Sequence, residues 1–515
     1  MNLSKKILEI LKPASDFILP SANAFSLPEK VIQFGTGVLL RSLPDLMINN
    51  ANNEGVFNGR IVIVKSTNGG GDAESFNKQD GLYSVCVRGI AENKRIDEVH
   101  ISAAVSRVLN AASSWDDILL CAENPDMQVV ISNTTEVGIA FAEDNIHASP
   151  PASFPGKLLT FLYHRYIFFK GSNDKGMVII PTELIPDNAD KLLSIILEKA
   201  HQNGLETAFI DWLENANYFC NSLVDRIVPG KLSAIEKSSI EKALGFKDDL
   251  IIMAEVYSLW AIQSDSEKVK NILSFATANK EIVISKNINK FRELKLRLLN
   301  GSHTFSCGIA FLAGFQTVKE AMEDQDFAQY IKQLMYDEII PSIIDDTIST
   351  EEAKAFADKV LDRYRNAYID HNWLSITAQY SFKMHLRNTA VIKNYYQRFG
   401  EAPPLMSLGM AAHILFLRSE KNEDGNYYGN VNDRNYLITD ANAAIYADTW
   451  KKYRRDFIVV NILGNKDLWQ TDFNELPGFA DEVNAQLNIL EERGVAVALQ
   501  EAIKEKKFLK IKIKF

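Results

Sequence analysis

Short apolar runs alternate with amphipathic stretches in the first part of the chain. The strands that this pattern predicts are residues 31–34, 60–65, 127–132 and 177–181. Buried parallel strands have continuous β-branched runs of this kind, and the helices that cross between them give the amphipathic stretches. The pattern therefore predicts a doubly wound α/β sheet in the N-terminal half.

From about residue 190 the hydrophobic period becomes that of helices. The helices that it predicts are residues 191–202, 239–244, 293–299, 327–336, 352–366 and 479–492. The polar stretch 277–290 is the best candidate for a boundary, which divides the chain into residues 1–280 and a mainly α-helical domain of residues 281–515. Apolar and lysine residues alternate in the tail, residues 501–515, and predict a half-exposed edge strand.

The composition excludes several classes of protein. With 515 residues, 46% of them hydrophobic, the chain is too long for a single small module. Its net charge of −10 does not attract a polyanion such as a nucleic acid, so an anionic ligand needs a local basic site. Length and charge thus favour a two-domain protein and argue against one that binds nucleic acid.

The four cysteines lie far apart and form no C-x-x-C motif, which argues against a disulfide framework and a zinc site. None of the eight histidines pairs with another at metal-ligand spacing. The chain has no signal-peptide pattern and no apolar run near the ~20 residues that cross a bilayer. We therefore expect a cytoplasmic protein without metal or membrane contact, either a monomer or a small homo-oligomer.

A glycine turn follows the first predicted strand in the segment QFGTGVLLR, residues 33–41. Dinucleotide folds place glycines there because the tight turn and the approach of the pyrophosphate leave no room for side chains. Gly35 and Gly37 occupy the first two places, but Leu40 stands where the third glycine or alanine is usual. A plain strand-to-helix turn is the alternative. The cofactor-binding residues expected here are Phe34, Gly35, Thr36, Gly37 and Leu39.

Two further strand ends face the expected cofactor. The second strand ends in Lys65 rather than the usual ribose-binding acid, so NAD is expected but NADP is not excluded. The third strand is followed by Asn133, Thr134 and Thr135, a polar turn at the edge where Rossmann-type domains bind ligands. These residues are expected to border the ribose, although they also suit a helix cap.

The segment ELKLRLLNGSH, residues 293–303, places three chemically active side chains among leucines. On an α-helix, Lys295, Asn300 and His303 lie at 0°, about 140° and about 80° around the axis, so they can share one side. Desolvation disfavours a charged lysine, and this allows such a lysine to act as a base near neutral pH. A snorkelling lysine, a capping asparagine and a satisfied histidine remain the structural alternative.

The same three residues match the K-x4-N-x2-H signature of the polyol-specific long-chain dehydrogenases, the mannitol dehydrogenase family. Residues 219–229 (FCNSLVDRIVP) resemble the family's F-x-x-x-M-V-D-R-I-T-P, and residues 363–371 resemble its R-F-x-N-P-x-I-x-H. The resemblance extends from about residue 30 to about residue 387. It implies a Rossmann-type domain followed by a helical domain, and hydride transfer between a nicotinamide and a linear sugar without metal.

Within the family, residues 132–136, 150–158 and 180–188 resemble the branch that reduces uronates. The mannitol branch has S-C-D-N where this chain has Pro181-Thr182-Glu183-Leu184. The implied reaction is the reversible, NAD-dependent reduction of D-tagaturonate to D-altronate in hexuronate catabolism. Fructuronate reduction, mannitol or sugar-alcohol oxidation, and a non-catalytic NAD-binding sensor are the alternatives.

The resemblance also implies roles for residues. Lys295 is the expected acid/base, Asn300 hydrogen-bonds the developing alkoxide, and Asn188 donates to it from the other side. His303 orients Lys295 or contacts a substrate hydroxyl. A uronate carboxylate needs a cation, and Lys383 and Arg387 are the candidates. His371, the last residue of the stretch 363–371, is also expected to bind the substrate.

Overall fold

The structure is a computed structural model, and it describes residues 1–515 apart from 13, 67–71, 135–137, 432–433 and 514–515. For residues 72 and 505–513 it describes the backbone alone. The chain divides into two compact units. The N-terminal unit comprises Met1–Gly89 and Arg95–Ile288, and the C-terminal unit comprises Ile90–Lys94 and Asn289–Phe515.

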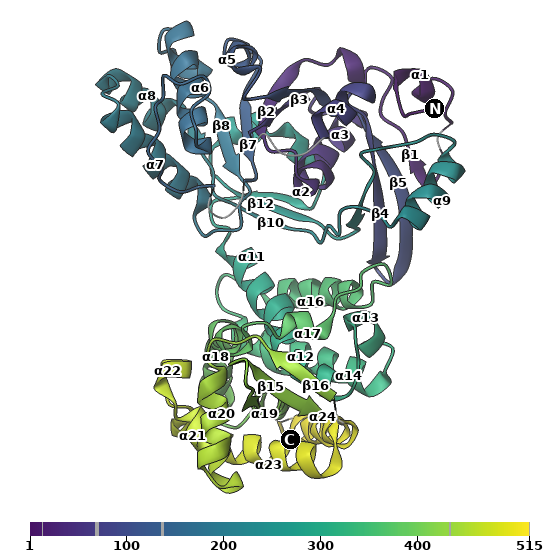
Figure 1. Ribbon diagram of the computed structural model, residues 1–515, viewed down its shortest axis with the longest axis vertical. Helices are drawn as coiled ribbons and strands as arrows, with labels where there is room; N and C mark the ends of the chain where they lie inside the picture. The colour runs from purple at the N-terminus through teal and green to yellow at the C-terminus, as the bar shows by residue number, and fades with distance from the viewer. Residues whose placement is uncertain (13, 67–71, 135–137, 432–433, 514–515) are drawn as a thin grey trace. The chain divides into compact units, whose positions relative to one another are not determined.

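A six-stranded sheet with parallel strand pairs forms the centre of the N-terminal unit (Figure 1). Its strands, in spatial order, are β6 (Val105–Asn110), β3 (Arg60–Lys65), β2 (Glu29–Phe34), β7 (Val129–Ser132), β8 (Val178–Pro181) and β9 (Tyr218–Phe219). The chain reverses direction across the sheet between β2 and β7. The carboxyl ends at such a reversal form the usual ligand crevice of doubly wound sheets.

Both faces of this sheet are buried, because alternate residues of each strand enter different apolar cores. Ile61 and Ile63 enter one core with α2 and α3, whereas Val62 and Val64 enter the other with α5–α8. Helices on both faces confirm the predicted doubly wound α/β fold. The helices of this unit are α1 (Lys5–Leu8), η1 (Ala24–Ser26), α2 (Val38–Ser42), α3 (Pro44–Asn53), α4 (Asp72–Lys78), α5 (Trp115–Ala122), α6 (Phe154–Phe168), η2 (Asn173–Lys175), α7 (Asn188–Gln202), α8 (Thr207–Ala216), α9 (Ala234–Leu244), α10 (Glu267–Ile272) and η3 (Ser274–Ala278).

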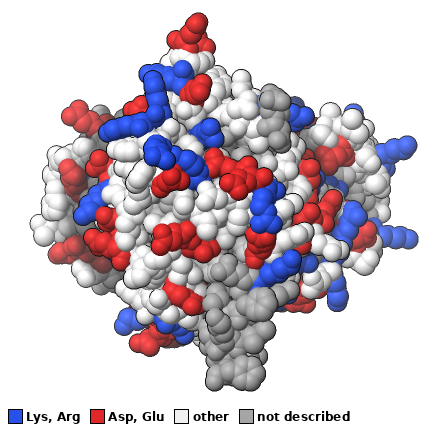
Figure 2. Space-filling model, turned by 90° about the horizontal axis from the view of Figure 1, so that it is seen from below, with Lys and Arg blue, Asp and Glu red and all other residues white. Residues whose placement is uncertain are grey.

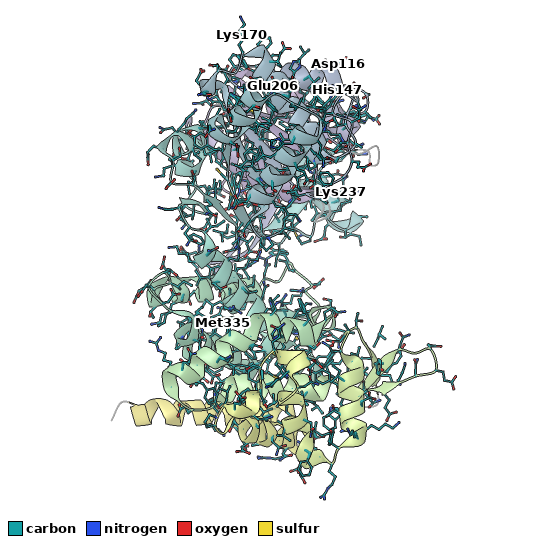
Figure 3. The ribbon with its side chains drawn as sticks, turned by 90° about the vertical axis from the view of Figure 1, so that its left-hand side faces the viewer. Asp116, His147, Lys170, Glu206, Lys237 and Met335 are labelled. Carbon is teal, nitrogen blue, oxygen red and sulfur yellow. The ribbon has the colours of Figure 1, made fainter. Side chains whose placement is uncertain are left out.

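Side-chain hydrogen bonds join neighbouring helices of the outer layer. The hydroxyl of Tyr163 on α6 donates to the carboxylate of Glu206, which precedes α8 and is labelled in Figure 3, at 3.1 Å.

Two smaller sheets complete the N-terminal unit. One is four-stranded, in the order β1 (Phe17–Ile18), β5 (Lys94–Ser102), β4 (Tyr83–Ala91) and β11 (Ile252–Glu255); the other contains β10 (Ser222–Asp225), β12 (Leu259–Gln263) and β13 (Ile282–Ser285). The helical period that the sequence predicts from residue 190 is therefore wrong for β9–β13. The β4–β5 hairpin was missed because Glu92 and Asn93, both at positive φ, make its turn without the usual glycine.

The C-terminal unit is rich in helices, as predicted. Its helices are α11 (Asn289–Leu294), η4 (Lys295–Gly301), α12 (Ser302–Leu312), α13 (Val318–Ala321), α14 (Gln325–Gln333), η5 (Leu334–Ile339), α15 (Ile340–Ile343), α16 (Thr350–Tyr364), α17 (Trp373–Ile376), α18 (Tyr380–Phe399), α19 (Pro404–Phe416), α20 (Ala443–Lys452), η6 (Arg455–Phe457), α21 (Ile458–Leu463), α22 (Lys466–Trp469), η7 (Phe473–Glu475), α23 (Phe479–Arg493) and α24 (Val495–Ile513). A small antiparallel sheet contains β14 (Glu420–Lys421), β15 (Tyr427–Val431) and β16 (Arg434–Ile438).

Helices α12 and α19 form the core of this unit. Nearly every residue of both is buried, as expected for helices that are apolar all round. Gly409 allows the close approach, since a Cβ there would lie 2.8 Å from Cδ1 of Phe305. This packing fixes the first turn of α12, which carries His303.

The predicted edge strand at the C-terminus is wrong, because residues up to Ile513 belong to helix α24. The segment that starts this helix is rich in alanine, leucine, glutamate and lysine, which favour helix, and a helix once started extends at little cost. The alternation of lysine with apolar residues at the tail was therefore a misleading local pattern.

Acidic and basic side chains are interspersed on the face of the molecule that Figure 2 shows, so neither sign dominates there. Among the described residues, no helix combines the length and apolar character needed to cross a bilayer.

Candidate active site

The glycine turn of the N-terminal unit connects β2 to α2. Gly35 has a φ of +131°, and a Cβ there would lie 2.9 Å from Cδ1 of Leu40 and 3.0 Å from the carbonyl oxygen of Asn133. Only glycine fits this conformation and these contacts. Gly37 differs, because no atom lies within 4 Å of its Cβ position and the residue is exposed. The turn is closed at Gly35 and open at Gly37, where a ligand could approach the backbone.

The other residues predicted for this turn divide by burial. Phe34 is fully buried and its ring lies 5.2 Å from that of Phe154, so its side chain belongs to the core. Thr36 and Leu39 are half-buried. Leu40, in the place of the third glycine, is buried and packs over Gly35. The backbone at Gly37 is therefore the exposed part of this turn.

Polar side chains tie the loops at the carboxyl ends of β7 and β8 together. Nδ2 of Asn133 donates to the carbonyl oxygen and the hydroxyl of Thr182, both at 3.0 Å. Thr134 donates its backbone N–H and its hydroxyl to Oε1 of Glu183 at 2.8 and 3.0 Å. Asn133 and Thr134, both predicted to bind the ribose, therefore use these donors to hold the end of β7 to the end of β8. Thr135 lies outside the described residues.

Lys65 ends β3 as predicted and is half-buried there, opposite Asn110 of β6. Both residues lie at the carboxyl edge of the sheet.

Asn188, predicted to donate to the substrate alkoxide, is fully buried. Its Nδ2 donates to the carbonyl oxygens of Pro181, Glu183 and Ser222 at 3.0 to 3.1 Å, and its Oδ1 accepts the N–H of Ser222 at 3.0 Å. In the structure this amide joins the end of β8 to β10, and the expected donation to the substrate stays a prediction. Sequence alone could not separate this role from a catalytic one.

The C-terminal unit carries Lys295 and Asn300 in a π-helical segment, η4, rather than in the predicted α-helix. A π-helix closes its turn between residues i and i+5, which is the spacing of these two residues, so they lie closer around the axis than in an α-helix. Both side chains are half-buried. Such segments are rare and occur frequently at functional sites. A second π-helical segment, η5, contains Met335, labelled in Figure 3.

Helix α18 holds η4 from one side. A Cβ at Gly301 would lie 2.8 Å from Oδ1 of Asn388, so glycine is needed for the approach. Nη1 of Arg297 donates to the carbonyl oxygens of Leu386 and Arg387 at 3.1 and 2.6 Å. These contacts place Arg387 beside the π-helical turn.

His303, on the first turn of α12, is buried with 7% of its surface exposed. Its ring stacks on Tyr364 at 4.1 Å and meets His371 edge to face at 5.3 Å. Burial, reinforced by His371, Arg363 and Arg387, lowers the pKa of His303 well below its usual value. The imidazole is therefore neutral at pH 7, and its Nε2 has no hydrogen-bond partner among the described residues. A buried acceptor without a partner in the protein is a site where a water or a ligand can donate a hydrogen bond.

Three cations surround this histidine pair. Nη1 of Arg387 donates to Oγ1 of Thr304 at 2.9 Å, and Nζ of Lys383 donates to the carbonyl oxygen of Ile376 at 3.1 Å. Burial lowers the pKa of both groups, and in Lys383 the charge of Arg387 adds to the effect. Arg363 is 7% exposed. Partly desolvated cations that lie close together favour an anionic ligand.

His371, the remaining predicted substrate-binding residue, is half-buried. Burial, with the charges of Lys383 and Arg363, lowers the pKa of its imidazole. Within the C-terminal unit the structure thus brings His303, His371, Lys383 and Arg387 into one electrostatically coupled cluster beside Asn300, whose carbonyl oxygen lies 3.4 Å from Nη1 of Arg387.

The four cysteines are free and buried. Among the described residues, no group of three or more histidine, cysteine or acidic side chains is arranged to hold a metal ion.

Family models match both parts of the chain. The mannitol dehydrogenase Rossmann domain matches residues 29–273, and the mannitol dehydrogenase C-terminal domain matches residues 287–491. The chain belongs to the mannitol dehydrogenase family. The resemblance inferred from sequence is confirmed, as is the enzyme class that it implied, an oxidoreductase acting on CH–OH groups.

Several members of this family are similar over most of their length. The altronate oxidoreductases of Halalkalibacterium halodurans and Bacillus subtilis are each 35% identical to the chain, over 92% of it and over 93% and 95% of their own lengths. That of Klebsiella pneumoniae is 36% identical over 92% of the chain and 96% of its own length.

Two solved structures share the fold. A D-sorbitol dehydrogenase aligns with a TM-score of 0.75 at 19% identity, covering 97% of this chain and all of its own. The mannitol 2-dehydrogenase of Pseudomonas fluorescens, solved as a ternary complex with NAD and D-mannitol, aligns with a TM-score of 0.64 at 20% identity, covering 98% of this chain and all of its own.

The sequence predictions did not include two residues of the cluster around His303 and His371. Arg363 and Tyr364 belong to the stretch that resembles R-F-x-N-P-x-I-x-H, but neither was selected as a site residue. Both residues could have been found from the sequence, because they lie in the same motif as His371, which was predicted to bind the substrate. The hydroxyl of Tyr364 pairs with Oγ of Ser302 at 2.8 Å and positions the ring on which His303 stacks.

Proposed function

We propose that this protein catalyses the reversible, NAD-dependent reduction of D-tagaturonate to D-altronate. The observation that carries the proposal is the cluster of Arg363, Lys383 and Arg387 around two neutral histidines in the C-terminal unit. Arg363 lies in a signature of the whole family and does not separate sugar acids from neutral polyols, whereas Arg387 supplies a cation that the carboxylate of a sugar acid needs and a neutral polyol does not. The names of the relatives at 34–36% identity, altronate oxidoreductases, support the same substrate class.

The residues of the N-terminal unit suit a dinucleotide. The turn is closed at Gly35 and open at Gly37, so the backbone there can take the pyrophosphate, and the ordered loop at Asn133 and Thr134 can border the ribose. NAD is the proposed cofactor. When bound, its nicotinamide supplies or accepts the hydride.

The proton chemistry falls to the C-terminal unit. We assign Lys295 as the acid that gives a proton to the keto oxygen on reduction and takes it back on oxidation. Asn300, one π-helical turn later, donates a hydrogen bond to the developing alkoxide. A preorganised donor of this kind contributes about 2.7 to 4 kcal/mol to the transition state.

His303 and the cations bind the remainder of the substrate. The neutral imidazole has a bare Nε2, which accepts a hydrogen bond from a substrate hydroxyl. Lys383 and Arg387 bind the carboxylate at the far end of the sugar acid. Asn188 joins the end of β8 to β10, and its donation to the alkoxide stays a prediction.

A panel of ketoses tests the proposal. NADH oxidation is followed by absorbance with D-tagaturonate, D-fructuronate and D-fructose, each over a range of concentrations. We expect tagaturonate to give the highest kcat/KM and the neutral ketose fructose the lowest. Turnover of fructose without turnover of tagaturonate would overturn the substrate assignment, and preference for fructuronate would retain the uronate class but not the named sugar.

A further inference from the structure

Glu183 is a buried carboxylate that the mechanism does not use. It follows β8 and has only 3% of its surface exposed. Its Oε1 accepts the backbone N–H and the hydroxyl of Thr134, and its Oε2 accepts the hydroxyl of Ser132 at 3.1 Å. Burial raises the pKa of Glu183 in spite of these donors. Among the described residues its side-chain hydrogen-bond donors are neutral, and a buried carboxylate with neutral donors is costly to a fold.

The segment that Glu183 holds packs directly on the glycine turn. Ser132 pairs with Phe34 across the β2–β7 ladder, and the N–H of Asn133 donates to the carbonyl oxygen of Phe34 at 3.2 Å. The carbonyl oxygen of Asn133 in turn lies 3.0 Å from the Cβ position of Gly35. A continuous path of contacts therefore runs from the carboxylate of Glu183 to the turn that faces the proposed pyrophosphate.

We propose that Glu183 is a positioning residue for dinucleotide binding, because its carboxylate fixes Asn133 and Thr134, directly after β7, against Gly35 before the cofactor arrives. Ordering a backbone segment costs conformational entropy, and a loop that is already fixed does not pay this cost again on binding. This inference rests on the proposed function, since it concerns the affinity of the same NAD site.

The test compares three variants with the unchanged protein, using NADH fluorescence for Kd and steady-state kinetics for KM and kcat. Glu183→Ala removes both acceptors. Glu183→Gln keeps an oxygen for Thr134, and its Nε2 can donate to the hydroxyl of Ser132, which also accepts. Glu214→Gln, on the exposed side of α8, is the matched control.

We expect Glu183→Ala to raise the Kd and KM for NADH about tenfold or more, while kcat at saturating NADH falls less than about threefold. Glu183→Gln should restore the Kd to within about threefold, and Glu214→Gln should leave it unchanged. If Glu183→Ala does not fold, Thr134→Val removes one of the two Thr134 hydrogen bonds and should raise the Kd by about threefold.

Two outcomes would overturn the proposal. One is an unchanged Kd for NADH in Glu183→Ala, or in Thr134→Val where the alanine variant does not fold. The other is a loss of kcat that saturating NADH leaves in place with KM unaltered, which would indicate a general structural role. Absence of NADH binding by the unchanged protein would instead overturn the proposed function itself, together with this inference.

Discussion

The two units prepare their ligand sites in opposite ways. At the carboxyl edge of the β2–β7–β8 sheet, the polar side chains of Asn133, Thr134, Glu183 and Asn188 hydrogen-bond to each other or to nearby backbone. In the C-terminal unit, His303 retains a buried nitrogen without a partner, and three cations lie close together.

This difference suggests different kinds of ligand for the two units. An edge whose side chains hold one another offers a rigid backbone surface, which suits a dinucleotide bound largely through main-chain groups. Partly desolvated cations, together with the Nε2 of His303 that has no partner among the described residues, suit an anion with hydroxyl groups such as a sugar acid.

Replacement of Lys295 by alanine should have the largest effect. General acid–base catalysis contributes about 10²- to 10⁴-fold, so we expect kcat to fall by that factor. NADH binding, assigned to the other unit, should stay within about twofold on fluorescence titration. Turnover above a tenth of the original would contradict the role of Lys295 and leave Asn300 and His303 as candidates.

Replacement of Arg387 by methionine should act on substrate binding. A hydrogen bond to a charged group contributes about 1.5 to 3 kcal/mol, which corresponds to a KM for tagaturonate raised about 10- to 100-fold. The KM for a neutral ketose should change far less. Lys393→Met, on the exposed side of the same helix, is the control. Equal effects on charged and neutral substrates would show that Arg387 supports the fold rather than the carboxylate.

Alanine at the two glycines should separate stability from cofactor affinity. Gly35→Ala imposes a disfavoured φ and close contacts, so we expect the free energy of unfolding to fall by about 1 to 3 kcal/mol. Gly37→Ala meets no protein atom and should change stability by less than about 0.5 kcal/mol. It should nevertheless raise the Kd for NADH about tenfold. Denaturant titration measures the free energy of unfolding, and NADH fluorescence measures the Kd. Equal changes of both quantities in the two variants would contradict the conclusion that the turn is closed at Gly35 and open at Gly37.

The smallest effect expected is a pH dependence of stability. The folded state holds His303 neutral, whereas the unfolded state binds a proton below about pH 6.5, so stability falls as the pH falls. Between pH 7 and pH 5.5, this histidine should account for about 1 kcal/mol of the loss. Urea titrations of the unchanged protein and of His303→Gln at both pH values measure it. An equal loss in both proteins would mean that His371 or other groups carry the dependence.

Local patterns predicted much of the framework. Strands β2, β3, β7 and β8 were found because each is a short apolar run, and Gly35 because a tight turn after the first strand needs glycine. The hairpin β4–β5 escaped because its turn lacks glycine, and the tail was misread because two residue types alternate in a helix that begins upstream. Both predictions were wrong because the conformation of the segment depends on residues outside the few positions that the pattern covers.

The amino-acid sequence by itself determined the order of the two units, the glycine turn and the Lys295, Asn300 and His303 spacing, because these depend on residues close together in the chain. Only the tertiary structure decided how they are used. It placed Lys295 and Asn300 in a π-helical turn, fully paired the amide of Asn188, and gathered Arg363, Lys383 and Arg387 around neutral histidines. The hydrogen-bond partners of a side chain and its loss of contact with water depend on atoms from distant parts of the chain. Only the packing of the folded chain brings these atoms together.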